Sequence, residues 1–249
     1  MRLAAALLLT VSLLGVSACG TTPPAAATGD EAVNDPLENT NRFFYRVNSG
    51  IDRYALRPVA VAYRDVVPGA VRRPIHNALA NASAPIVFAN DVLQGRPRRA
   101  GDTFMRFLIN STAGAGGFFD VATSLGYPAH DNDAGLTFAL WGVPEGPFLF
   151  LPVLGPSNPR DVTGFGTDIA LDPFTWVGFP GSNALNYTRY GLGAVDARAE
   201  LIDPIDQINK TALDPYATFR SLYRQRRASS VQAIRDDNRA TVPAWFPRR

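Results

Sequence analysis

Side chains able to perform catalytic chemistry are scarce in this sequence of 249 residues, which contains one cysteine and two histidines. Asp131 and Asp133 flank Asn132 close to His130, a grouping that suits either a weak metal site or, more commonly, a solvated turn. His76 fits a surface residue better than a general base. The chain beyond its N-terminal leader has neither a Gly-x-Ser-x-Gly elbow nor a His-Glu-x-x-His motif. We therefore expect no enzymatic activity, no metal and no cofactor.

The single cysteine, Cys19, lies at the end of an apolar N-terminal segment. Arg2 supplies a minimal positive charge, and residues 3–14 are apolar but too few for a confident membrane span. The small residues directly before Cys19 resemble a bacterial lipobox, which implies removal of residues 1–18 and fatty acylation of the cysteine by diacylglycerol and a palmitate-type chain. Several acyl chains would hold the protein in a bilayer. The alternative is an ordinary signal peptide with a coincidental cysteine.

The following segment has the composition of a tether. Residues 20–34 are rich in Pro, Thr, Ala and Gly and show no periodicity. A flexible coil of this length spans roughly 20–25 Å, which holds the folded part close to the membrane. We divide the chain into a signal peptide (1–18), a lipidated N-terminus with a flexible tether (19–34), one helical domain (35–227) and an Arg-rich C-terminal tail (228–249).

Composition and charge narrow the class of protein further. With 46% hydrophobic and 18% charged residues, the chain can bury a core and still leave apolar surface for a partner or a lipid. A formal net charge of +2 is too small to indicate a nucleic-acid-binding protein. The charge is nevertheless segregated, with excess base in residues 42–106 and 220–249 and excess acid in residues 107–219. These segments either pair within one domain or present arginines to lipid phosphates or an acidic partner.

Periodicity predicts a mainly α fold made of short amphipathic helices with little β-structure. The sequence Asp35-Pro36-Leu37-Glu38 predicts a helix start with Asp35 as N-cap and Glu38 completing a capping box. The apolar stripe that follows comprises Leu37, Phe44, Val47, Ile51 and Tyr54. Asp-Pro pairs at 172–173, 203–204 and 214–215 punctuate the rest of the chain. Dispersed prolines and glycines argue against a regular four-helix bundle and favour an irregular body.

Two segments stand apart from this helical pattern. Residues 104–121 place aromatic residues on either side of a run made only of Asn, Ser, Thr, Ala and Gly. Such small residues allow close helix packing or leave room for a groove. Residues 146–154, GPFLFLPVL, suit either a buried core segment or an apolar surface that faces lipid.

Three separate runs resemble one family of proteins. They are DPLENTNRFFYRVNSGIDRYALRPVAVAYRDVVP at 35–68, FMRFLINSTAGAGGFFDVA at 104–122 and GPFLFLPVLGPSNPRD at 146–161. Together they are similar to the MlaA (VacJ) family of outer-membrane phospholipid-transport lipoproteins. The likeness covers roughly residues 35–227, and the lipobox is an independent match.

The resemblance implies a ring of helices embedded in the inner, periplasmic leaflet of the outer membrane and anchored there by lipid. An amphipathic channel through the ring would remove mislocalised phospholipids from the outer leaflet. It would pass them to a periplasmic phospholipid carrier of the MlaC type and so maintain lipid asymmetry. The family lies beside trimeric porins and performs no covalent chemistry.

The resemblance also indicates where the channel lies. It assigns Asn110, Gly114, Gly116, Gly117, Phe118 and Phe119 to the channel wall. A helix or gating segment includes Asn41, Arg46 and Val47. Two other functions remain open at this stage: a structural envelope lipoprotein that binds porins without moving lipid, and a lipid hydrolase.

Overall fold

The computed structural model describes residues 34–178 and 180–237. This part of the chain is mainly helical, with one antiparallel hairpin of two short strands, so the predicted fold class is confirmed. In chain order the elements are α2 (Glu38–Ile51), η1 (Asp52–Leu56), α3 (Arg57–Val66), α4 (Gly69–Leu93), α5 (Pro97–Thr112), α6 (Val121–Ser124), α7 (Ala134–Leu140), β1 (Leu149–Leu151), β2 (Gly155–Ser157), α8 (Pro159–Leu171), α9 (Pro173–Trp176), α10 (Ser182–Glu200), α11 (Ile202–Thr211) and α12 (Pro215–Arg235). None of these helices is both long enough and apolar enough to cross a membrane.

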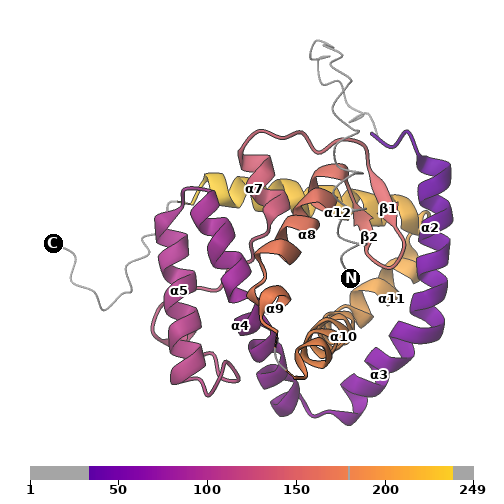
Figure 1. Cartoon of the computed structure of the whole chain (residues 1–249). Coiled ribbons are helices and arrows are strands. Elements are labelled where there is room, and N and C mark those ends of the chain that lie inside the picture. Colours follow the sequence, from indigo (N-terminus) through magenta and orange to yellow (C-terminus); the bar gives the residue numbers. More distant parts are fainter. Residues whose placement is uncertain (1–33, 179, 238–249) are drawn as a thin grey trace. The chain divides into compact units, whose positions relative to one another are not determined.

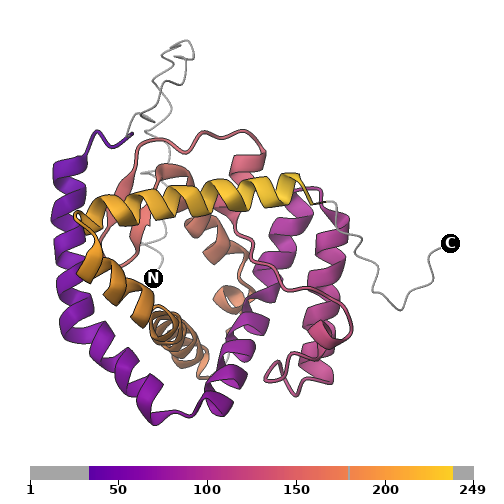
Figure 2. The ribbon, with the colours of Figure 1, turned by 180° about the vertical axis from the view of Figure 1, so that it is seen from behind.

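Contacts between these elements form a closed circuit (Figures 1 and 2). The π-helix η1 joins α2 to α3, α3 packs on α10, and α10 packs on α4. From α4 the circuit continues through α7 to α12, then through the hairpin back to α2, because β2 contacts α12 and β1 contacts α2. The hairpin pairs Leu149 with Ser157 and Leu151 with Gly155. The ring-like arrangement thus arises from a series of contacts between elements that closes on itself.

Side-chain caps explain why several of these helices begin where they do. Asp172 accepts a hydrogen bond from the amide of Phe174 at the start of α9, and Asp214 accepts one from Ala217 at the start of α12. In both cases proline follows the cap, where its missing N–H costs nothing. Of the three Asp-Pro pairs expected to punctuate the chain, those at 172–173 and 214–215 start helices. At 203–204, Asp203 lies inside α11, whose N-cap position is Leu201. Helix α12 then runs to Arg235, so the Arg-rich tail expected from residue 228 starts inside a helix rather than after one.

The predicted cap of the first helix is wrong. Helix α2 has Leu37 at its N-cap position with no side-chain cap. The carboxylate of Asp35 is buried and instead accepts hydrogen bonds from Asn41 Nδ2 at 2.7 Å, from Arg220 Nη1 at 2.7 Å and from the Tyr216 hydroxyl. Three donors, one of them charged, outcompete the single backbone N–H that a cap would bind. Asp35 therefore ties the start of α2 to α12.

An aromatic cluster forms the core beneath the hairpin. Phe148, Phe150 and Tyr216 are buried, with Phe44, Tyr45 and Tyr223 packed around them. The rings meet edge to face, as between Tyr45 and Phe150 at 5.5 Å between centroids. In the segment 146–154, Phe148 and Phe150 are buried, as expected of a core segment, while Val153 and Leu154 at the hairpin tip are exposed.

The segregated charges pair with one another inside the domain. Arginines of the two basic segments bind acids elsewhere in the chain, as in Arg42 with Asp214 at 2.6 Å and Arg227 with Asp133 at 2.6 Å. Most of these pairs join residues more than 90 positions apart. Of the two interpretations of the charge pattern, internal pairing accounts for these arginines, and it holds the circuit of helices together.

Candidate amphipathic pocket

Two pockets in the described part of the chain bear on function, one of about 940 Å³ and one of about 220 Å³, and they are called the larger and the smaller pocket. The wall of the larger pocket is formed by α2, η1, the hairpin, the C-terminal end of α10, α11 and the start of α12. Four of the five η1 residues line it, namely Asp52, Arg53, Tyr54 and Leu56. A π-helical turn widens the helix by one residue and is frequent at functional sites. Here it places two charged side chains, one tyrosine and one leucine on the pocket wall.

Two ion pairs brace this pocket across the circuit. Arg198 on α10 donates from Nε and Nη2 to the two carboxylate oxygens of Asp52, at 2.6 and 2.9 Å. Arg57 on α3 binds Asp206 on α11 in the same two-pronged way, at 3.1 and 2.6 Å. Hydrogen bonds from Arg57 lower the pKa of Asp206, so the carboxylate stays charged at neutral pH. Bidentate pairs of this kind fix geometry as well as charge.

Apolar groups make up the rest of the wall, so the pocket is amphipathic. Leu56, Ile205 and Phe219 face it from η1, α11 and α12, and Val153 and Leu154 come from the hairpin tip. Arg46, Arg53 and Lys210 add positive charge. A pocket with apolar surface beside several cations suits a ligand with an acidic head and apolar tails.

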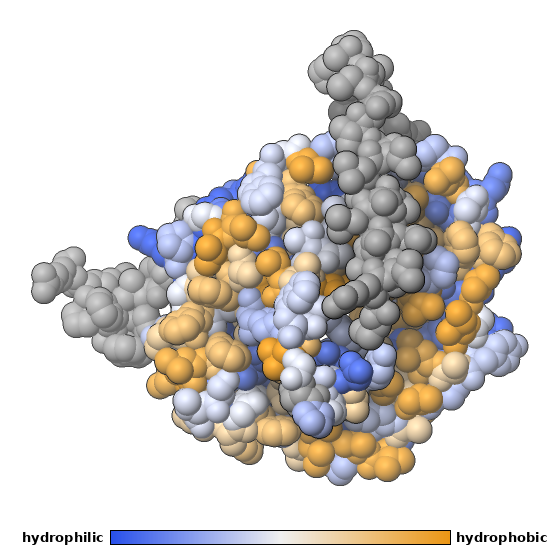
Figure 3. Space-filling model, in the orientation of Figure 1, coloured by the Kyte–Doolittle hydropathy of each residue, from blue (hydrophilic) through white to orange (hydrophobic). Residues whose placement is uncertain are grey.

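Many apolar side chains are exposed outside the larger pocket. They lie on α2 and α3, on α4 and α5, and on α9 and α10, and they include Phe43, Val47, Val59, Val66, Phe88, Val92, Phe104, Leu108, Trp176 and Leu185. Figure 3 shows apolar surface along the α2–α3 edge and over the α4–α5 side of the molecule. Monomeric proteins in water rarely expose so much apolar surface, which marks a contact with lipid or with another protein.

The predicted channel residues lie away from the larger pocket. Of the six, Asn110 lines the smaller pocket between α4 and α5, and none lines the larger pocket. Asn110 is buried and accepts from the amide of Ala122 at 3.0 Å, while its Nδ2 donates to Asp120 at 3.1 Å. Phe118 and Phe119 are exposed on the turn that follows α5.

The glycines of this turn meet structural requirements of their own. A Cβ on Gly114 would lie 2.2 Å from the carbonyl oxygen of Phe119, and one on Gly117 would lie 2.6 Å from the side chain of Asn81. Gly116 has φ +78° and open space around it. Such φ values are costly for residues with a Cβ. The turn therefore needs glycine for packing and backbone shape, whatever it does for lipid.

The predicted gating segment separates into three different environments. Arg46 lines the larger pocket, and Val47 is exposed and does not line it. Asn41 is buried, where its Nδ2 donates to the carbonyl oxygen of Phe148 at 2.9 Å and its Oδ1 accepts from the amide of Phe150 at 2.8 Å. Asn41 thus fixes strand β1 to α2.

Sequence reasoning missed Asn48, which repeats this arrangement two turns later. Its Nδ2 donates to the carbonyl oxygen of Leu151 and its Oδ1 accepts from the amide of Val153, at 2.8 and 2.9 Å. The spacing of seven residues between Asn41 and Asn48 places both amides on one helix face, and that regularity was visible in the sequence.

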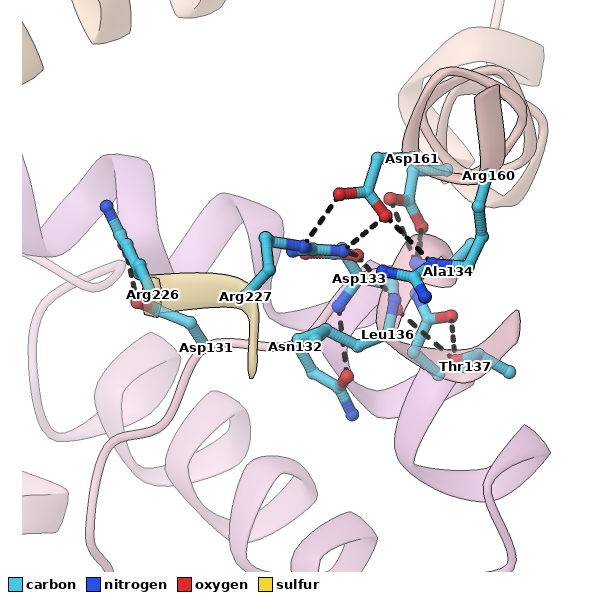
Figure 4. Close-up of polar contacts among 12 residues, drawn as sticks. Asp131, Asn132, Asp133, Ala134, Leu136, Thr137, Arg160, Asp161, Arg226 and Arg227 are labelled. Atoms are coloured by element: carbon cyan, nitrogen blue, oxygen red, sulfur yellow. Dashed lines mark hydrogen bonds and ion pairs between the residues drawn. The ribbon is translucent and has the colours of Figure 1, made fainter. Parts of the chain in front are cut away.

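The loop at 130–133 is not the wholly solvated turn that its sequence favoured. His130 Nε2 lies 2.9 Å from Asp91, while Asp133 caps α7 by accepting from the amide of Leu136. Figure 4 shows Arg227 bridging Asp133 and Asp161, with its Nη2 2.9 Å from an oxygen of each. Asp131 lies apart from this group beside Arg226 and is exposed. The side chains of this loop therefore bind separate partners in the fold rather than one another.

His76 is half-exposed and joins α4 to α10. Its Nδ1 lies 2.9 Å from Asp196 and 3.5 Å from Glu200, and the Tyr63 hydroxyl donates to the other oxygen of Asp196. Among the described residues, His76, Asp196 and Glu200 form the one group whose ligand atoms lie close enough together to hold a metal ion. Each distance is also that of an ordinary ion pair, so the group is explained as a link between two helices.

Sequence reasoning also missed most of the pocket cations. Arg46, Arg53 and Arg57 follow one another at intervals of seven and four residues, which indicates one helix face opposite the apolar stripe. Lys210 is the one lysine of the chain. Nothing local in the sequence indicates that α11 brings it to the same pocket.

Fold and pocket together define a class of protein: a mainly helical body with an apolar outer surface and an amphipathic pocket within its circuit of helices. The sequence profile of the MlaA lipoprotein family matches residues 33–230. The chain therefore belongs to the MlaA lipoprotein family.

Named relatives and a solved structure agree with this assignment. The Haemophilus influenzae protein "Intermembrane phospholipid transport system lipoprotein MlaA" is 38% identical over 201 residues, 77% of each chain. The Escherichia coli protein of the same name is 34% identical over 254 residues, 95% of this chain and 96% of the relative. A solved structure described as "Structural basis for maintenance of bacterial outer membrane lipid asymmetry" has a TM-score of 0.69 at 32% identity. The match covers 79% of this chain and 98% of that one.

Proposed function

We propose that this chain is an outer-membrane lipoprotein that takes phospholipids mislocalised in the outer leaflet and passes them through its larger pocket to a periplasmic carrier. The observation that carries the proposal is the larger pocket itself, which sets cations beside apolar side chains inside a circuit of helices. A phospholipid needs such a path, since its head group is charged and its tails are apolar. The names of the relatives and the description of the solved structure support the same role.

The outer surface supports a position within one leaflet. Apolar side chains exposed on α2 to α5 and on α9 to α10 would lose contact with water when they enter acyl chains, which is favourable. The described helices include none that could cross the membrane, and partial insertion agrees with that. Trp176 and Tyr187 are exposed and have the amphipathic rings that favour the head-group region.

Anchoring and partners complete the proposal. The lipidated N-terminus at Cys19 lies outside the described residues and would hold the body at the inner leaflet. A trimeric porin beside the ring would cover part of its apolar surface, and a periplasmic MlaC-like carrier would receive the lipid. The transfer moves a phospholipid without forming or breaking covalent bonds.

Complementation of a strain that lacks the corresponding protein tests the function. Wild-type protein should restore a phospholipid-free outer leaflet, measured by accessibility of phospholipids to an external phospholipase. Ile205→Trp fills the larger pocket and should abolish this rescue at normal protein level. Leu222→Trp adds the same bulk on α12 outside both pockets and serves as the matched control.

The outcomes separate transport from a porin-binding scaffold. Rescue by Ile205→Trp as full as that by Leu222→Trp would contradict passage through the larger pocket. Normal porin association with no effect of wild-type protein on outer-leaflet phospholipid would favour the scaffold.

A further inference from the structure

The larger pocket contains more positive charge than its own acids neutralise. Asp52 and Asp206 are the acids on its wall, and each is held by one arginine, Arg198 and Arg57. Those four charges cancel in pairs. Any further cation on the wall is therefore available to a ligand.

Three further cations line the pocket: Arg46, Arg53 and Lys210. All three are exposed, and within residues 34–178 and 180–237 none has a carboxylate at ion-pair distance. Arg46 and Arg53 come from α2 and η1, whereas Lys210 comes from α11. The unpaired charges therefore converge on the pocket from elements on both sides of it.

Arg198 adds unused hydrogen-bonding capacity. Its side chain is 6% exposed, and its Nη1 is buried without an acceptor among the described residues. A buried donor without a partner is costly, and an acceptor would reach it only if the Arg198 side chain shifted toward the pocket. The wall thus favours an anion by its charge.

The occupant must also be apolar over part of its length. Leu56, Ile205 and Phe219 face the same space as the cations. A soluble anion such as phosphate would leave these side chains without a partner, whereas acyl chains would cover them.

We propose that the larger pocket selects phospholipids whose head group carries a net negative charge, such as phosphatidylglycerol and cardiolipin, over zwitterionic phosphatidylethanolamine. The inference rests on the proposed function and adds a substrate preference to it. A zwitterionic head group brings an amine that Arg46, Arg53 and Lys210 repel. An anionic head group brings only the charge that they attract.

Competition between two lipids tests the preference. The full-length lipidated protein is purified in detergent with equimolar phosphatidylglycerol and phosphatidylethanolamine of identical acyl chains, and bound lipid is counted by native mass spectrometry. Wild-type protein should hold phosphatidylglycerol with an enrichment of about five-fold or more, since one basic contact near an anionic surface is worth about that factor. Because exposed charges are screened, the enrichment should fall when salt rises from 0.05 to about 0.5 M.

A charge-neutral variant provides the second arm. The triple change Arg46→Gln, Arg53→Gln and Lys210→Gln should reduce the enrichment to about one while the total bound lipid and the melting temperature stay near wild type. Arg98→Gln removes an exposed arginine outside both pockets and should leave the enrichment unchanged.

The experiment distinguishes failure of the lipid preference from failure of the proposed transport function. Bound lipid in the equimolar ratio for wild-type protein, or an enrichment that survives the triple change, would overturn the preference and leave transport intact. No bound phospholipid of either kind would count against the proposed function itself.

Discussion

Replacing Asn41 by alanine should destabilise the protein because one buried side chain makes three hydrogen bonds. Its amide donates to Asp35 and to the carbonyl oxygen of Phe148, and it accepts from the amide of Phe150. Alanine leaves two buried backbone groups without partners, the carbonyl of Phe148 just before β1 and the amide of Phe150 within it. An unsatisfied buried group costs about 1–3 kcal/mol, so we expect the free energy of unfolding to fall by about 3 kcal/mol. For a domain of this size that lowers the melting temperature by roughly 6–12 °C.

Asn48→Ala is the matched control for this prediction. Asn48 makes the same kind of contacts with Leu151 and Val153, but the hydrogen bond to the Val153 amide is exposed. Water can replace the lost partners there, so the expected loss is about 1 kcal/mol. Thermal and denaturant unfolding of both variants, followed by circular dichroism in the same detergent, give the two values.

The comparison also distinguishes two roles for Asn41, holding β1 against α2 and controlling the passage of lipid. If Asn41→Ala unfolds like wild type yet allows phospholipid to accumulate in the outer leaflet, Asn41 acts as the gating residue that the sequence predicted. Bracing of β1 would then be the wrong account. Equal losses for both asparagine variants would refute the argument from burial.

Four further predictions concern other parts of the chain. Cys19→Ala should leave unprocessed or mislocalised protein, and an unchanged outer-membrane fraction with an unchanged N-terminal mass would exclude lipidation. Val47→Asp puts a charge on an exposed apolar face, so it should unfold like wild type in detergent but insert poorly, at a cost of about 3 kcal/mol in lipid; wild-type membrane association would argue against insertion of α2. Gly116→Ala and Gly116→Leu share the strain of a positive φ. A transport defect of the leucine variant alone, at equal stability of the two variants, would place Gly116 on the lipid path. Equal transport by both variants would show that Gly116 does not line that path. Burial raises the pKa of Asp168 to about 6 from 3.8, so its contribution to stability is present below pH 3.8 and lost as pH rises through 6. Asp168→Asn should therefore raise the free energy of unfolding by up to about 3 kcal/mol at pH 7.5 and hardly at pH 4. An equal effect at both pH values would contradict the raised pKa.

Local signals in the sequence predicted the features that depend on neighbouring residues. Asp172 and Asp214 cap the helices that follow them because a cap needs only a side-chain oxygen and a free amide in the next turn. Gly95 is a signal of the same local kind, because with φ +65° it follows Gln94, the C-cap residue of α4. The mainly helical fold follows from many such starts and stops.

Features that depend on distant residues were not predictable in this way. Asp35 has the pattern of a cap, yet Tyr216 and Arg220 reach it from positions 181 and 185 residues away. The pocket likewise needs Lys210 and Arg46 from separate helices. Family resemblance directed attention to the glycine-rich turn, but it could not show that the larger pocket lies against α2 and η1.

The central claim is that phospholipid occupies the larger pocket, and photocrosslinking in a bilayer tests it most directly. The full-length protein is incorporated into membranes that contain a phospholipid with a photoreactive group at the end of one acyl chain, and crosslinked residues are mapped by mass spectrometry. The account predicts adducts on pocket residues such as Ile205 and Phe219, and their loss in Ile205→Trp. Adducts confined to exposed outer side chains such as Phe88 and Phe119, with none in the pocket, would contradict it.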